Sequence, residues 1–88
     1  MRTIITNKHF DNLLFKLIKH DDILAQKVNN IFEKISKDVF DPSLKTHKLK
    51  GDLKKYHACS INFSIRVIFR ITDECVFMQS IGSHDEVY

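Results

Sequence analysis

The chain has 88 residues, which is enough for one small domain. With 43% hydrophobic and 28% charged residues, its composition is typical of a globular protein and excludes disordered and fibrous classes. No apolar run approaches the roughly 20 residues of a membrane span, and the N-terminus lacks the apolar segment of a secretory signal. Cys59 and Cys75 are too few for a disulfide scaffold and lack zinc-site spacing. We therefore expect a reduced, cytoplasmic domain over residues 1–88, with no metal or cofactor.

Charge is unevenly distributed along the chain, although the net charge is only +3. Residues 45–72 carry seven Lys and Arg residues against one acidic residue, whereas residues 73–88 carry four acidic residues and no Lys or Arg. A concentrated basic stretch is typical of proteins that bind a polyanion such as nucleic acid. Lysines also decorate exposed strands and turns simply for solubility. Charge alone therefore leaves both interpretations open.

The first half of the chain has the pattern of a short strand followed by a helix. Residues Thr3–Thr6 are β-prone, and Asn7 is a suitable helix N-cap. From Phe10 to Ile18 apolar residues recur with the spacing of one helix face. This pattern predicts an amphipathic helix of about 13 residues.

A second amphipathic helix follows after a polar break. Asp21 or Asp22 can cap it, and its apolar stripe runs from Leu24 to Ile35. Two such helices joined by a short turn predict an αα-hairpin. We expect helical structure to end at Asp41-Pro42, because the residue before a proline is driven out of the α region.

After the proline the apolar period changes from helical spacing to alternation. Two alternating runs, Tyr56–Phe63 and Ile65–Thr72, and the nearly all-apolar run Cys75–Ile81 read as strands, and Gly82 is expected to release the chain from the last one. The element order is then one strand, two helices and about four strands. This order predicts an α+β fold in which the helix pair packs on one face of an antiparallel sheet and leaves the other face for function.

The basic stretch contains groups suited to phosphate chemistry. Arg66 and Arg70 are four residues apart on a strand and so project from one face, where a guanidinium could stabilise a phosphorane. RNA transesterification also needs a base for the 2′-hydroxyl and an acid for the 5′-oxygen, and His47, His84 and Tyr88 are candidates. Spacing alone favours ordinary surface residues, because isolated Arg and His side chains are common on surfaces.

The remaining titratable residues suit structural roles better. His9 and His20 flank the first helix. His57 lies on a strand beside the basic stretch, where it could contact phosphate, but we expect it to be a solvent-exposed residue. Cys59 and Cys75 fall in strands and are expected to be small core residues. No Walker, GxSxG or HExxH pattern occurs, so nothing supports an NTPase, an α/β-hydrolase or a zinc protease.

Three stretches together carry a family resemblance: HKLKGDLKKYHACSI, RVIFRI and the ending IGSHDEVY. They resemble the RelE/ParE superfamily of type II toxin–antitoxin toxins, and most closely its RelE/StbE and YafQ-like branch. The resemblance runs from about Thr3 to Tyr88 and is carried by an HxLxG motif at His47–Gly51 and the tail at Gly82–Tyr88. It implies a RelE-like β-α-α-β-β-β-(β) fold and a cognate antitoxin as partner. The implied activity is metal-independent cleavage of mRNA in the ribosomal A site, with contacts to 16S rRNA.

The resemblance also implies roles for individual residues. His84 matches the C-terminal catalytic histidine of the YafQ-like branch, and His47 matches the first histidine of HxLxG. Arg66 matches the strand arginine that steadies the transition-state phosphate, and Tyr88 matches the terminal aromatic that contacts RNA. The residues that match the family's basic RNA-binding surface only in kind are Lys45, Lys48, Lys50, Lys54, Lys55 and Arg70.

The sequence departs from these relatives at three positions. Ser60 and Ser64 stand where YafQ-like toxins carry a histidine and an aspartate, and Ser43 stands where the YoeB branch carries a catalytic glutamate. Our hypothesis is a hybrid site in which His84 is the principal acid and base and Arg66 the electrostatic stabiliser. His47 then serves as a phosphate contact or as a second proton-transfer group.

Two other functions share the expected fold. A ParE-like toxin poisons DNA gyrase without nuclease activity, but it typically lacks the HxLxG motif and the histidine-containing tail. A toxin relic would retain only tight binding to its antitoxin and would cause no growth arrest. The motifs favour the ribonuclease.

Overall fold

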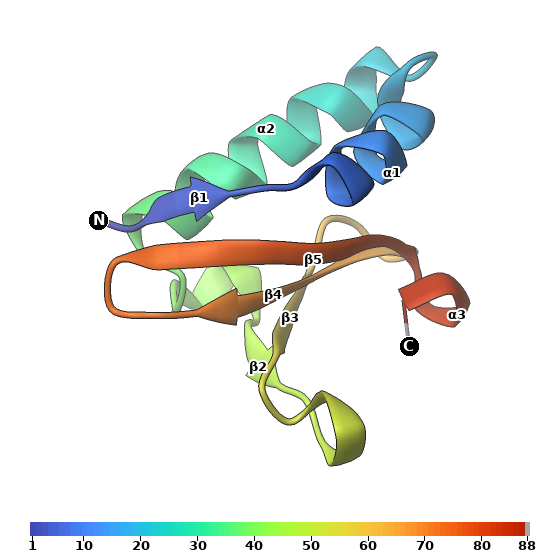
Figure 1. Cartoon of the computed structure of the whole chain (residues 1–88). Helices are drawn as coiled ribbons and strands as arrows, with labels where there is room; N and C mark the ends of the chain where they lie inside the picture. Colours follow the sequence, from blue (N-terminus) through green and yellow to red (C-terminus); the bar gives the residue numbers. More distant parts are fainter. Residues whose placement is uncertain (88) are drawn as a thin grey trace.

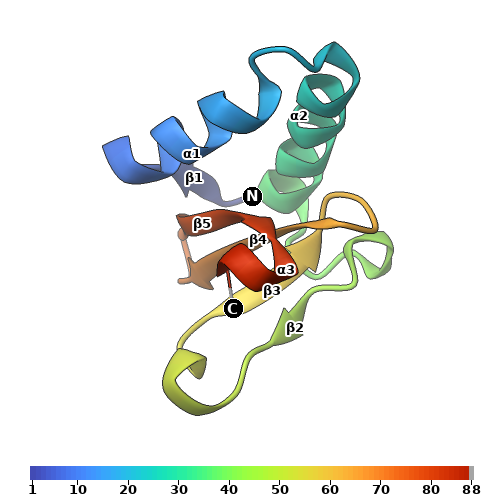
Figure 2. The ribbon, with the colours of Figure 1, turned by 90° about the vertical axis from the view of Figure 1, so that its right-hand side faces the viewer.

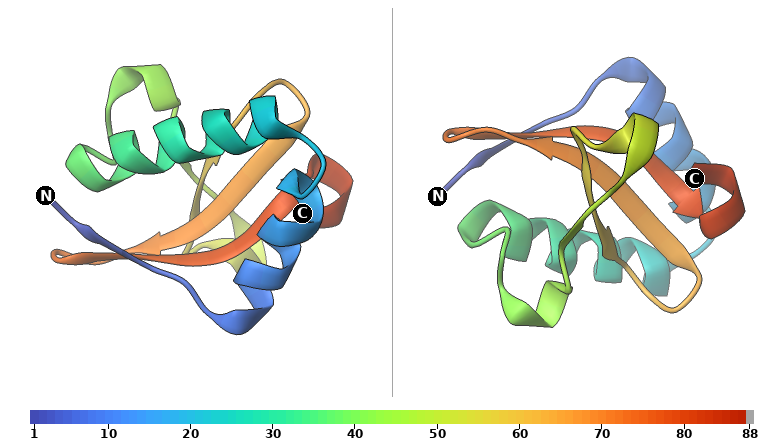
Figure 3. Two further views of the ribbon diagram at one scale, coloured as in Figure 1. Left: turned by 90° about the horizontal axis from the view of Figure 1, so that it is seen from above. Right: turned by 90° about the horizontal axis from the view of Figure 1, so that it is seen from below.

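The computed structural model describes residues 1–87 and contains one five-stranded sheet in the order β1-β5-β4-β3-β2. Figure 1 shows α1 and α2 on one side of this sheet, and Figure 3 shows the same layers from above and below. The predicted α+β architecture, with a helix pair over one face, is therefore confirmed. The elements are β1 (Thr3–Ile5), α1 (Lys8–Ile18), α2 (Asp22–Lys37), β2 (His47–Lys48), β3 (His57–Ser60), β4 (Ile65–Ile71), β5 (Cys75–Ser83) and α3 (His84–Val87), with short 3-10 turns η1 (Pro42–Leu44) and η2 (Gly51–Leu53).

The two helices begin at the predicted caps. The backbone N–H of Phe10 donates to Asn7 Oδ1 at 2.8 Å, and the N–H of Leu24 donates to Asp21 Oδ1 at 2.9 Å. Each bond satisfies one of the N–H groups that a helix start leaves without a partner. α1 has 11 residues, and α2 ends at Lys37, before the proline that was expected to end it. Pro42 instead opens η1, where a proline in the first turn loses no hydrogen bond.

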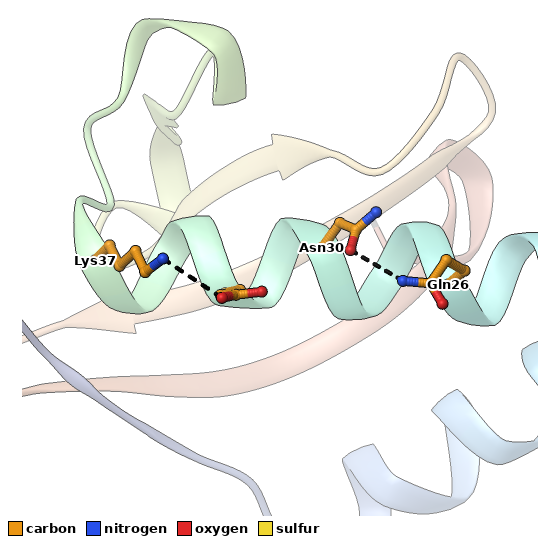
Figure 4. A network of polar contacts seen from close by, with 4 residues as sticks. Gln26, Asn30 and Lys37 are labelled. Carbon is orange, nitrogen blue, oxygen red and sulfur yellow. Dashed lines mark hydrogen bonds and ion pairs between the residues drawn. The ribbon is translucent and has the colours of Figure 1, made fainter.

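The outer surface of α2 is polar. Figure 4 shows Gln26 Nε2 donating to Asn30 Oδ1, at 3.1 Å, and an ion pair between Lys37 and Glu33, at 3.4 Å. Both partners of the ion pair are more than 60% exposed, so the pair contributes little to stability.

No helix within residues 1–87 is long and apolar enough to cross a membrane.

The sheet differs from the prediction in two respects. β1 pairs with β5 in parallel, with Ile4 opposite Val76, so the sheet is not wholly antiparallel. β5 continues through Gly82, which lies opposite Arg66 in β4, to Ser83. The expectation that Gly82 releases the chain from the strand is therefore wrong. Because Ser83 at the end of β5 pairs with Ile65 at the start of β4, α3 begins beside the N-terminal end of β4 (Figure 2).

The core lies between the helix pair and one face of the sheet. Phe10 of α1 and Ile35 of α2 are completely buried, and they belong to the same apolar cluster as Val67 and Phe69 of β4. Cys59 is a buried member of this cluster, and burial raises the pKa of its thiol to about 12. Its predicted role as a small core residue is confirmed, whereas Cys75 is only half-buried.

Candidate active site

The face of the sheet away from α1 and α2 carries the candidate site. Strand register defines two neighbouring rows across this face, because facing residues in adjacent strands point to the same side. The rows are His47, Ala58, Ile68 and Ser80, and Ser60, Arg66 and Gly82.

A hollow of about 410 Å³ lies on this face, lined by His47, Leu49, Arg66 and His84. These residues come from β2, the segment after it, β4 and the start of α3. Figure 2 shows β2, an edge strand of the sheet, farther from the helix pair than β4 and β5, and α3 directly after β5. The structure thus brings together three of the four residues proposed as catalytic from the sequence. The fourth, Tyr88, lies outside the described residues.

The arginine of the hollow is held by the turn between β3 and β4. Arg66 Nη1 donates to the carbonyl oxygens of Asn62 at 2.9 Å and Phe63 at 3.2 Å. The Asn62 side chain fixes the turn, because its Oδ1 accepts from the N–H groups of Ser64 and Ile65 at 2.9 and 2.8 Å. Arg66 Nε and Nη2 make no hydrogen bond to another residue in the described part of the chain. A planar guanidinium can donate from these atoms to a ligand oxyanion.

The HxLxG motif shapes the opposite wall of the hollow. His47 Nδ1 lies 3.2 Å from the carbonyl oxygen of Lys45, which can only accept, so this contact places the ring proton on Nδ1. The Nε2 atom of the neutral ring is then a proton acceptor. Gly51 has φ +64°, the left-handed conformation that favours glycine, and Leu49 lines the hollow. The histidine, leucine and glycine of the motif thus each have a structural role.

The lysines predicted to bind RNA are exposed on a single stretch, residues 45–55, which we call the basic segment. Figure 1 shows its η2 turn projecting from the body of the fold. Arg70 shares the outer face of β4 with Arg66, as predicted, but it does not line the hollow. Its guanidinium carbon instead lies 4.5 Å from the centre of the Phe77 ring, a cation–π contact.

Sequence comparison places the chain in a known family. The family described as bacterial toxin of type II toxin–antitoxin system, YafQ, matches residues 2–88. The chain belongs to the YafQ family of toxins. No curated protein shows significant similarity to it.

Solved structures of such toxins share the fold of this YafQ-family chain. A metal-bound toxin from Helicobacter pylori is 28% identical, with a TM-score of 0.80 and complete coverage of both chains. YafQ from Escherichia coli is 17% identical, with a TM-score of 0.82, covering 100% of this chain and 99% of its own. YafQ in the E. coli DinJ–YafQ toxin–antitoxin complex is 18% identical, with a TM-score of 0.80 and coverage of 99% and 97%. The expected RelE-like fold is confirmed.

The serines at which this YafQ-family toxin departs from the catalytic pattern have mainly local roles. Ser43 donates to Asp41 Oδ1 from its N–H at 2.8 Å and from Oγ at 2.7 Å. These bonds hold the pKa of Asp41 below its ordinary value. Ser64 bonds Asn62 within the turn that holds the arginine, and Ser60 lies opposite Arg66 across the strands. Among the residues whose side chains the structure describes, no group of three or more His, Cys, Asp and Glu residues is placed to hold a metal ion.

His57 is not the solvent-exposed residue expected from the sequence. It lies opposite Phe69 on the helix-covered side of the sheet. Its ring packs edge-on against the Phe40 ring, with 5.8 Å between the ring centres. Its Nδ1 is buried and has no hydrogen-bond partner among the described residues. Burial, and then the nearby charges of Lys48 and His47, lowers the pKa of His57. Alternation in the sequence puts His57 on the same strand face as Cys59, a core residue, but the contact with Phe40 was not visible in the sequence.

The lowered pKa makes His57 a source of acid sensitivity. Below about pH 6.5 the unfolded chain takes up a proton at this residue before the folded chain does. The free energy of unfolding therefore falls as the pH drops through 6.5 towards the folded-state pKa. We expect the Tm of the wild type to fall more between pH 7.5 and pH 5 than the Tm of His57→Gln. Parallel Tm curves in differential scanning calorimetry would show that the burial of His57 has no such consequence.

Proposed function

We propose that this toxin is a ribosome-dependent endoribonuclease that cuts mRNA in the A site and thereby inhibits translation. The observation that carries the proposal is the hollow, in which His47, Arg66 and His84 meet from three separate elements. Two imidazoles and a guanidinium are the groups that RNA transesterification requires. Membership of the YafQ family supports a toxin role for the chain.

The proposed reaction proceeds by attack within the RNA strand and uses no metal ion. A histidine takes the proton of the 2′-hydroxyl, the 2′-oxygen bonds to phosphorus, and the bond from phosphorus to the 5′-oxygen breaks. A protonated histidine gives its proton to the departing 5′-oxygen. The products are a 2′,3′-cyclic phosphate and a 5′-hydroxyl. Arg66 stabilises the added negative charge of the phosphorane through the guanidinium donors that the turn leaves open.

We assign the main proton-transfer role to His84. His47 is then a phosphate contact or the second proton-transfer group, and its hydrogen bond to the Lys45 carbonyl fits either role, because it orients the ring. Tyr88 is proposed to contact the RNA, as the terminal aromatic does in related toxins. The proposal therefore assigns most of the proton transfer to the residue that begins α3.

The basic segment is proposed to hold the nucleic acid backbone of mRNA and 16S rRNA. Its five lysines are exposed, and the stretch contains one acidic residue, Asp52. The hollow is shallow, so the toxin by itself surrounds little of a substrate. The ribosome would supply the missing order by fixing the mRNA in a reactive geometry.

We also propose a cognate antitoxin as partner in the cytoplasm. The E. coli relative forms a toxin–antitoxin complex with DinJ, and its chain superposes on nearly all of this one. An antitoxin that covers the hollow or the basic segment would block the reaction. A short reading frame directly beside the gene is where such a partner is to be sought.

Purified toxin added to ribosomes programmed with a defined mRNA tests the proposal. We expect discrete cuts within the translated region by primer extension, with 2′,3′-cyclic phosphate on the upstream fragments. Free mRNA should be cut far less efficiently, because it lacks the order that the ribosome imposes. Growth arrest in cells without any cut would instead point to another target, such as DNA gyrase.

A further inference from the structure

Phe63 is the most exposed phenylalanine among the described residues. Its side chain is 93% exposed at the tip of the turn between β3 and β4. A single exposed apolar residue is ordinary. The backbone of Phe63, however, contacts the arginine of the candidate site: the carbonyl oxygen of Phe63 lies 3.2 Å from Arg66 Nη1, and only two covalent bonds separate that oxygen from the Cα that carries the ring.

The turn that presents this ring is fixed by many hydrogen bonds. Asn62 Oδ1 accepts from two backbone N–H groups, and the N–H of Ile61 donates to the carbonyl oxygen of Ile65 at 2.8 Å. The guanidinium of Arg66 also donates to the carbonyl oxygens of Asn62 and Phe63. An aromatic ring on a rigid turn loses little backbone entropy when it binds a flat partner.

We propose that Phe63 is a stacking platform for an RNA base adjacent to the phosphate held by Arg66. The inference rests on the proposed ribonuclease function and extends it by assigning a binding position for a nucleobase. One side chain would engage the charged backbone and its neighbour the flat base, the combination by which single-stranded nucleic acid is bound.

The surroundings of Phe63 favour RNA over a protein partner. Its carbonyl oxygen accepts a hydrogen bond from the Arg66 guanidinium, and Arg66 lines the hollow together with two histidines. The basic segment approaches the same face through His47. An apolar protein surface would leave these cations without a complement, whereas a nucleotide provides a flat ring and a phosphate together.

Substitutions at Phe63 test the proposal on two readouts. The first is the single-turnover rate of cleavage on programmed ribosomes. The second is the Kd for a nine-nucleotide single-stranded RNA, measured by fluorescence anisotropy. Phe63→Ala should lower the cleavage rate and raise the Kd, each by about 5- to 100-fold, which corresponds to the loss of one base–aromatic stack. Phe63→Leu, which is apolar but has no π face, should behave like Phe63→Ala, and Phe63→Trp should match the wild type.

Phe15→Ala is the matched control, because Phe15 is also well exposed, at 63%, but lies in the helix layer on α1. It should change neither readout, and neither Phe63→Ala nor Phe15→Ala should lower Tm. Unchanged rate and Kd in Phe63→Ala, or equal function of Phe63→Leu and Phe63→Trp, would overturn the stacking assignment. If the wild type binds the RNA but cuts nothing, the nuclease proposal fails, while the Kd series still decides the role of Phe63.

Discussion

His84→Ala is expected to lower the rate of ribosome-dependent cleavage by about 10²–10⁴-fold, the usual contribution of a general acid or base. His84 lines the hollow with Arg66 and is exposed at the start of α3, so its loss removes the proposed proton-transfer group without opening the core. We expect the binding of RNA to the basic segment not to depend on His84. Single-turnover kinetics on programmed ribosomes should therefore show a slower chemical step with little change in the toxin concentration required.

Two further histidine variants make this result specific. His20→Ala, in the exposed turn after α1, removes an imidazole far along the chain from the hollow and should leave cleavage unchanged. His47→Ala should also reduce the rate, by less than His84→Ala if His47 is a phosphate contact. A larger loss in His47→Ala than in His84→Ala would reverse the two roles. Cleavage by His84→Ala at the wild-type rate would remove His84 from the mechanism.

Arg66→Ala is expected to reduce the cleavage rate by about 10²–10³-fold, the typical loss when one preorganised donor to a developing negative charge is removed. Arg66 points from β4 into the hollow and is oriented by the Asn62 and Phe63 carbonyls. Arg66→Lys keeps the charge but loses the planar fork that bonds the turn and an oxyanion together. We expect it to recover only part of the rate.

Arg70→Ala is the matched comparison for Arg66. It removes the same charge from the same face of β4, four residues along, from a side chain that packs over Phe77 instead of lining the hollow. Its effect should be limited to weaker, salt-sensitive RNA binding. Equal losses of the rate constant in Arg66→Ala and Arg70→Ala would mean that general positive charge, and not the position of Arg66, supports the reaction.

The helices and central strands were predictable because their signals are local. Asn7 and Asp21 cap the helices where the sequence places them, and the alternation in β4 correctly assigns Arg66 and Arg70 to one face. The parallel pairing of β1 with β5 was not predictable, because the two strands lie some 70 residues apart. The continuation of β5 through Gly82 depends on its pairing with Arg66, which the glycine itself does not reveal.

The candidate site was predictable in membership but not in arrangement. The sequence and its family resemblance pointed to His47, Arg66 and His84, and the fold brings these three to one hollow. It could not show that Arg70 turns to Phe77, because that contact depends on the register between β4 and β5. The turn that orients Arg66 had a visible signal, Asn-x-Ser between two strands, whose importance appeared only with the arginine bonded to it.

The most direct test of the central claim is inducible expression in a bacterial host, with primer extension on a translated reporter mRNA. The toxin is compared with His84→Ala and Arg66→Ala at equal protein levels. The hollow as a ribonuclease site predicts growth arrest by the wild type with discrete cuts in the translated frame, and loss of both in the two variants. Growth arrest with no cuts, or cuts that persist in both variants, would contradict it.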